Sequence, residues 1–183
     1  MNPLKSLLKA CARKRHSRGF GIHSPYAFQF VNDVIRPKDY GYYAYDLIDD
    51  NASLKGNEAR EAKWFVRLFV FLNTHRVLIT GSYPEAATIA AKSLGKKFVI
   101  LKPGKPKEFK TGDILIISSQ DCNSELIDKA EKTLTPILAL HAGPRLNETL
   151  CRPLEKGLLL RGRKKILLIP REEMDYVSYE INL

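Results

Sequence analysis

At its centre the sequence reads Arg76-Val77-Leu78-Ile79-Thr80-Gly81-Ser82-Tyr83-Pro84-Glu85. The apolar run after Arg76 predicts a buried strand, the glycine predicts a turn, and the residues from Pro84 onward predict a helix. Doubly wound α/β proteins hold nucleotide-like ligands at such a junction of strand, turn and helix. Gly81, Ser82 and Tyr83 are therefore predicted to contact a ligand.

The alternation of strand and helix continues along the chain. Each further strand is a continuous apolar run of the kind that is buried on both faces of a parallel sheet. We therefore predict an α/β fold with a Rossmann-like, doubly wound, mostly parallel sheet. Ser118 and His141 end two of these strands, where ligands bind in such sheets, and they join the candidate site. The predicted strands are residues 76–80, 97–101, 113–118 and 136–141, and the predicted helices are residues 84–94, 124–134 and 145–155.

The end of the chain has a different pattern. Apolar runs at residues 158–160, 166–169 and 176–181 have no helix between them. The last run alternates between the two sides of a strand, as expected for a sheet that is half exposed. We predict an antiparallel hairpin that closes one edge of the sheet.

Residues 1–57 are predicted to form a helical, Tyr-rich extension that makes one structural unit with a Rossmann-like domain at residues 58–183. Ser24 and Pro25 favour a helix start, and that helix should run to Ile35 and stop before Pro37. A long amphipathic helix is predicted at residues 58–72.

Four tyrosines stand close together at positions 40, 42, 43 and 45. They can form a stacking platform for a base or ring, or they can clamp a loop onto the core. The second is the commoner use of such residues, and we favour it.

The composition indicates a soluble globular protein with one sizeable core, because 44% of the 183 residues are hydrophobic and 27% are charged. No apolar run reaches the roughly 18 to 20 residues that span a bilayer. Lysines interrupt the amphipathic segment at residues 1–18, which argues against a secretory signal. Cys11, Cys122 and Cys151 have neither disulfide nor metal-site spacing. We predict a cytoplasmic protein.

The net charge of +10 is unevenly distributed, since no acidic residue precedes Asp33. Basic clusters bind phosphate backbones or anionic lipid surfaces through long-range attraction and counterion release. A solvated basic surface without a partner is the alternative interpretation. The clusters are Lys5, Lys9, Arg13, Lys14 and Arg15 near the start, and Arg152, Lys156, Arg161, Arg163, Lys164 and Lys165 near the end.

Parallel strands followed by a terminal antiparallel hairpin resemble the layout of class I S-adenosylmethionine-dependent methyltransferases. The stretch Gly19-Phe20-Gly21-Ile22-His23-Ser24-Pro25-Tyr26 is similar to the Gly-Val-His-Ser-Pro-Phe opening of a methyltransferase-like family from Bacteroidetes. That family continues with a Tyr-rich stretch, a helix and a strand. Its ending is similar to Tyr176-Val177-Ser178-Tyr179-Glu180-Ile181. The resemblance implies S-adenosylmethionine as the cofactor.

Several residues depart from the family pattern at the positions that serve the cofactor. Ile79 replaces a glutamate, Glu85 replaces the second turn glycine, and Ser118 replaces an aspartate. Lys102 stands where methyltransferases place the acidic residue that accepts hydrogen bonds from the ribose hydroxyls. Residues 102–112 are also too few for the helix, strand and helix found there in the family. We therefore predict that the third strand and its flanking helices are missing.

Two of the candidate site residues also have purely structural interpretations. Ser82, followed three residues later by Glu85, fits a capping box, which needs no ligand and places a negative charge at the helix start. His141 can act as a general base near neutral pH, but the sequence identifies no partner for it, and a lone histidine at a strand end is more often a structural residue. His23 precedes a helix cap, where it serves an anchoring hydrogen bond at least as well as catalysis.

The sequence thus predicts a methyltransferase-like protein with a degenerate cofactor site and weak or lost activity, a pseudoenzyme. S-adenosylmethionine is the only cofactor it suggests, no metal is predicted, and no catalytic residue is identified. The alternatives are a non-catalytic basic module that binds nucleic acid or an anionic membrane surface, and a protein that binds a protein partner through its aromatic N-terminal segment.

Overall fold

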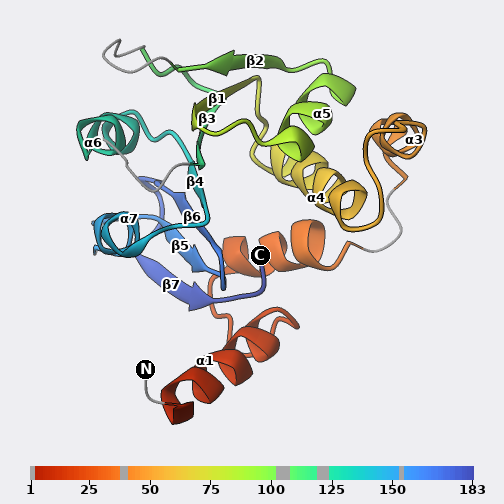
Figure 1. The fold of residues 1–183 in the computed structure, drawn as a ribbon. Helices are drawn as coiled ribbons and strands as arrows, with labels where there is room; N and C mark the ends of the chain where they lie inside the picture. The colour runs from red at the N-terminus through yellow and green to blue at the C-terminus, as the bar shows by residue number, and fades with distance from the viewer. Residues whose placement is uncertain (1–2, 38–40, 102–107, 119–123, 153–154) are drawn as a thin grey trace.

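The computed structural model describes residues 3–37, 41–101, 108–118, 124–152 and 155–183, with side chains from Leu7 onward. Its strands form one sheet with helices on both faces (Figure 1). The predicted α/β architecture with a mostly parallel, doubly wound sheet is confirmed at this level. The strands are β1 (Arg76–Gly81), β2 (Lys97–Ile100), β3 (Asp113–Ser118), β4 (Ile137–Leu140), β5 (Leu158–Arg161), β6 (Lys165–Ile169) and β7 (Val177–Glu180).

The strand order is β2-β1-β3-β4-β6-β5-β7. The first four strands are parallel, and β6 runs antiparallel to both β4 and β5. The predicted antiparallel hairpin is correct for β5 and β6 but wrong for β7, which pairs parallel with β5. Because β4 and β5 occupy both sides of β6, β7 does not pair with β6 and instead lies beyond β5, at the edge of the sheet.

The connection between β2 and β3 is the place where a third strand and its helices are predicted to be missing. Within the described residues, 101 and 108–112 contain no helix or strand, and β2 forms an edge of the sheet. Lys102 and Pro103, on which the predicted loss of the ribose contact depends, lie outside the described residues. That part stays a prediction.

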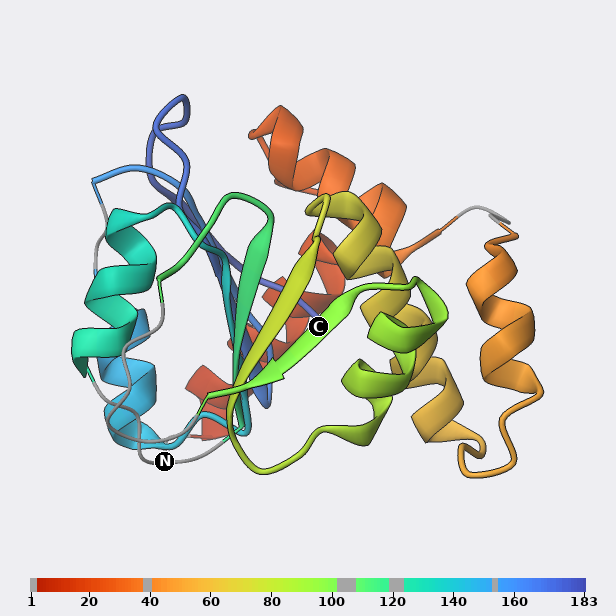
Figure 2. The same cartoon turned by 90° about the horizontal axis from the view of Figure 1, so that it is seen from above.

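The two faces of the sheet bury different sets of side chains, because successive residues of a strand point to opposite sides. Val77 and Ile79 of β1 face one helical layer, while Leu78 faces the other. Figure 2 shows α6 and α7 on one face and the remaining body helices on the opposite face. The helices are α1 (Pro3–His16), α2 (Pro25–Phe30), the π-helical turn η1 (Val31–Ile35), α3 (Tyr43–Asp49), α4 (Asn57–Phe71), α5 (Glu85–Ser93), α6 (Ser124–Lys132) and α7 (Pro144–Leu150).

The N-terminal extension packs into the same core as the sheet. Ser24 caps α2, since its Oγ accepts a hydrogen bond from the Ala27 backbone N at 3.3 Å, and η1 continues α2 to Ile35 as predicted. Phe30 is buried in the cluster that also holds strand residues of β1 and β6. The described helices are not long and apolar enough to cross a membrane.

Part of the tyrosine stretch holds its segment against the body of the protein, which is the interpretation that the sequence favoured. The rings of Tyr42 and Tyr45 pack edge to face at 5.2 Å, and the Tyr45 hydroxyl accepts a hydrogen bond from Arg67 Nη1 at 3.1 Å. Tyr43 is 76% exposed, and Tyr40 lies outside the described residues. Helix α3, which begins at Tyr43, was not predicted.

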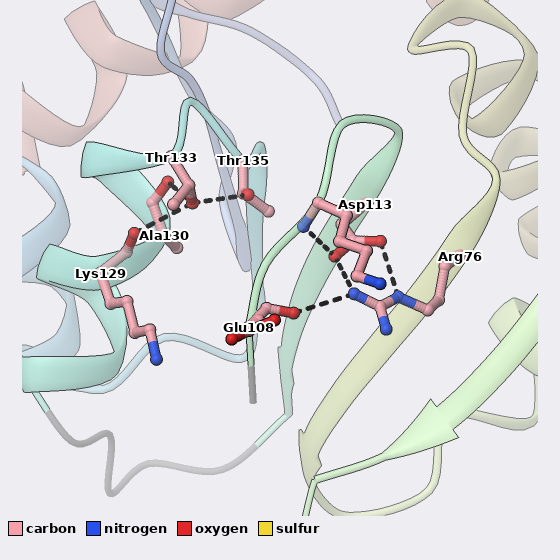
Figure 3. Close-up of polar contacts among 8 residues, drawn as sticks. Arg76, Glu108, Asp113, Lys129, Ala130, Thr133 and Thr135 are labelled. Carbon is pink, nitrogen blue, oxygen red and sulfur yellow. Dashed lines mark hydrogen bonds and ion pairs between the residues drawn. The ribbon is translucent and has the colours of Figure 1, made fainter. Parts of the chain in front are cut away.

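The amino ends of β1 and β3 are joined by a buried polar anchor (Figure 3). Arg76 Nε donates to Asp113 Oδ1 at 2.8 Å, and Arg76 Nη2 donates to the Glu108 carbonyl at 3.0 Å. Asp113 Oδ2 also accepts from the Lys110 backbone N at 2.7 Å. The hydrogen bond from Arg76 to Asp113 raises the pKa of Arg76. This anchor lies at the edge of the sheet opposite the candidate site, so its role is structural.

Candidate functional site

The carboxyl ends of β1, β3 and β4 bring the predicted site residues to one crevice. Ser82, Tyr83, Ser118 and His141 line it together, as expected for parallel strands that end at the same edge. Gly81 is not a lining residue. Its φ of 98° lets the chain turn away from β1, which is a conformation that favours glycine.

The hydroxyls of Ser82 and Ser118 are used within the protein. Gly81 and Ser118 are paired in register at the ends of β1 and β3. Ser82 Oγ donates to the Ser118 carbonyl at 2.9 Å, while Ser118 Oγ contacts the carbonyls of Thr80, at 3.2 Å, and Ser82. These reciprocal bonds, which we call the serine bridge, tie the turn after β1 to the end of β3.

The predicted capping box at Ser82 and Glu85 is wrong. Helix α5 starts at Glu85 with Pro84 as its N-cap, and no side chain of the described residues caps it. Ser82 lies too early to serve the first turn, because the helix begins at Glu85 itself. Its hydroxyl is satisfied by the serine bridge instead.

Tyr83 does not form a free stacking platform. Its ring packs edge to face on Phe98 of β2, with the ring centroids 5.7 Å apart, although 55% of the residue stays exposed. The ring covers the edge strand next to the crevice.

One wall of the crevice is acidic, which the sequence did not reveal. Glu58 and Glu61, from the start of α4, line it together with Glu85. Glu61 pairs with Lys165 at 2.7 Å, and Lys165 Nζ lies 4.4 Å from the Trp64 ring centroid. A helix that precedes a parallel strand starts at the carboxyl edge of the sheet, and this topological rule could have indicated Glu58 and Glu61.

His141 follows β4 with a positive φ of 56°, and its backbone N donates to the Lys164 carbonyl at 2.7 Å. Its side chain is exposed and has no hydrogen bond or ion pair with another described residue. His141 therefore has no carboxylate partner in the described part of the chain to orient it as a general base.

The crevice is small, with a volume of about 230 Å³. Small-molecule sites typically occupy roughly 300 to 1,000 Å³. A second hollow of about 380 Å³ adjoins it and shares Glu61, Leu140 and His141 with it, so the ion pair between Glu61 and Lys165 stands where the two meet. The first hollow is below this range and the second lies at its lower end.

The residues present do not fit S-adenosylmethionine. Ile79 is 1% exposed and belongs to the apolar core, so it offers no hydrogen bond where the resembling family has a glutamate. Ser118 is occupied by the serine bridge, so its hydroxyl is already used within the protein. Among the described residues, no group of His, Cys, Asp or Glu is arranged to hold a metal ion.

The His23-Ser24-Pro25 motif joins the two ends of the chain. The backbone N of His23 and that of Ser24 donate to the Tyr179 hydroxyl at 3.2 and 3.3 Å. Arg171 stacks over the Tyr26 ring at 4.4 Å. The motif and the chain ending, which together carry the family resemblance, are therefore in direct contact, and the anchoring interpretation of this motif describes its geometry.

The two basic clusters meet at Glu180. Arg13 of α1 lies 3.7 Å from Glu180 Oε2, and Arg161 of β5 lies 3.5 Å from Oε1. Burial raises the pKa of the Cys151 thiol, against the smaller lowering by Arg161. We call these two ion-paired arginines and the basic residues close to each of them in the sequence the basic end, which comprises Lys9, Arg13, Lys14, Arg15, Arg161, Arg163 and Lys164.

Some residues of the two predicted basic clusters do not belong to the basic end. Arg152 forms ion pairs of 2.6 Å with both Asp128 and Glu131, and Lys165 is held by Glu61. The side chain of Lys5 lies outside those that the structure describes. The charges of Arg152 and Lys165 are therefore largely balanced.

Comparison of the chain with protein-family models, with curated proteins and with solved structures found no match.

Proposed function

We propose that this protein is a methyltransferase-like scaffold that has lost its cofactor site and acts by binding an anionic partner. The layout of parallel strands followed by the antiparallel pair of β5 and β6 supports the methyltransferase-like origin. The serine bridge and the buried, apolar Ile79 argue against a working cofactor site.

The observation that carries the binding role is the meeting of two basic segments, from opposite ends of the chain, at Glu180. Lys14, Arg15, Arg163 and Lys164 are all exposed, and they form no ion pair with a described residue. Unbalanced cations on one surface create a positive potential that attracts polyanions and releases their counterions.

Heparin chromatography tests this role, because heparin is a polyanion without sequence or headgroup specificity. We expect retention at about 50 mM salt and elution as the salt concentration rises. The double variant Arg163→Gln/Lys164→Gln should elute at lower salt than the unmodified protein. Lys92→Gln/Lys132→Gln is the matched control, since it removes the same charge from the opposite edge of the molecule and should elute close to the unmodified protein.

Two results would overturn the binding role. One is no retention of the unmodified protein at low salt. The other is an equal shift for both double variants, which would mean that net charge, and not the basic end, governs retention.

A further inference from the structure

Helix α1 turns its apolar side away from the rest of the protein. Leu7 and Leu8 are 61% and 62% exposed, and Cys11 is exposed beside them. At 3.6 residues per turn, these three side chains share one face of the helix. An amphipathic helix of a globular protein normally buries this face.

The opposite side of α1 is fixed to the body. His16 Nδ1 lies 2.8 Å from the Glu180 carbonyl, and its ring packs edge to face on Tyr179 at 5.4 Å. Ser17 is buried, and its Oγ accepts a hydrogen bond from the Asn182 backbone N at 2.8 Å. Figure 1 shows α1 outside both helical layers, below the sheet. The outward apolar face is therefore held in place by contacts at the end of the helix.

Two basic side chains lie on the same face of α1, beyond its leucines. Lys14 and Arg15 lie two helical turns beyond Leu7 and Leu8 on the same side, and both are exposed. Apolar side chains flanked by Lys and Arg on one helix are typical of helices that lie in the interface of an anionic lipid membrane. The long basic side chains can reach the headgroups while the leucines enter the acyl boundary.

Charge and size argue against a nucleic acid or a second copy of this chain as the partner that covers this face of α1. A phosphate backbone gains nothing from exposed leucines, so a nucleic acid would leave Leu7 and Leu8 unused. A second copy of this chain would bring the two basic ends together, and the few apolar side chains fall far short of the roughly 1,000 Å² that a stable interface buries.

We infer that α1 docks the protein on anionic lipid membranes, with Leu7, Leu8 and Cys11 inserted and the basic end facing the headgroups. This inference rests on the proposed anion-binding function and names its partner. A basic patch and one apolar helix face act together, since neither alone gives firm membrane binding.

Vesicle flotation tests the inference on the full chain. We expect the protein to float with vesicles of phosphatidylcholine and phosphatidylserine, and to stay behind with vesicles of phosphatidylcholine alone. Leu7→Gln/Leu8→Gln should weaken vesicle binding at least tenfold, because it removes the inserted surface. The same variant should elute from heparin with the unmodified protein, because its charge is unchanged. Leu47→Gln on α3, also an exposed leucine, is the control and should bind vesicles normally.

The outcomes separate the two proposals. Heparin retention without vesicle binding would overturn the membrane inference and leave the anion-binding function, as would vesicle binding that Leu7→Gln/Leu8→Gln does not weaken. Failure on both heparin and vesicles would overturn both. As a second readout, anionic vesicles should slow the alkylation of Cys11 by a water-soluble maleimide at least threefold, and an unchanged rate contradicts insertion of this face.

Discussion

Tyr179 is the residue that fastens the N-terminal motif to the end of the chain. Its hydroxyl is the shared acceptor for two backbone N–H groups, and its ring packs against His16 at the base of α1. Without this hydroxyl, both backbone N–H groups lose their protein acceptor at a half-buried position. The contribution of Tyr179 is therefore structural.

Tyr179→Phe should lower the free energy of unfolding by about 1 kcal/mol, because it removes these two hydrogen bonds and keeps the ring. Urea unfolding measures the change. Tyr43→Phe is the control, since Tyr43 is largely exposed, and it should change stability by less than about 0.5 kcal/mol. Equal stability of the two variants would contradict an anchoring role for the motif.

Cys151 should react with iodoacetamide more slowly than the exposed Cys11 at about pH 8. Burial raises the pKa of the Cys151 thiol above its ordinary value, against the smaller lowering by Arg161, so less of the reactive thiolate is present. Its alkylation rate should therefore still be rising with pH where that of an ordinary thiol has levelled off. Peptide mass spectrometry follows each site, and faster reaction at Cys151 would contradict the assigned burial.

At the scale of single elements, the serine bridge holds the turn after β1 against the end of β3. The hydroxyls of Ser82 and Ser118 are therefore used within the protein and not for a ligand. Ser118→Ala removes the bonds from Ser118 Oγ to the carbonyls of Thr80 in β1 and of Ser82 just after it. We expect a loss of about 1 kcal/mol in the free energy of unfolding, because the partly buried Thr80 carbonyl loses its protein donor. If thermal unfolding shows that Ser118→Ala is as stable as the unmodified protein, the serine has no structural role and is again a candidate ligand contact.

The local elements were largely predictable from the sequence, because their signals are local. Ser24 and Pro25 start α2 as expected, and the apolar runs after Arg76 and at residues 113–118 form β1 and β3. Helix α7 ends at Leu150, earlier than predicted, since the residue before Pro153 disfavours helix. The capping box failed because Ser82 found a partner on another strand, which the local sequence does not encode.

At the scale of the whole molecule, the sequence could not show which surfaces meet. The pairing of β7 with β5 sets Arg161 beside Glu180, and the packing of α1 on β7 adds Arg13. The contact of Arg13 with Glu180 joins the two ends of the chain, so the basic end has no signature in any one segment. The candidate crevice was predicted in position, since strand ends define it, but the acidic wall from α4 was missed.

The sheet thus has the carboxyl edge at which doubly wound proteins bind ligands. The hydrogen-bonding groups of Ser82 and Ser118 at that edge are paired with the protein's own backbone. We propose that this edge does not bind S-adenosylmethionine. Isothermal titration calorimetry of the full chain with S-adenosylmethionine is the most direct test. We predict no binding heat at ligand concentrations up to about 1 mM, which corresponds to an affinity weaker than roughly 4 kcal/mol. A saturable isotherm with a micromolar Kd would contradict the claim and restore a working cofactor site.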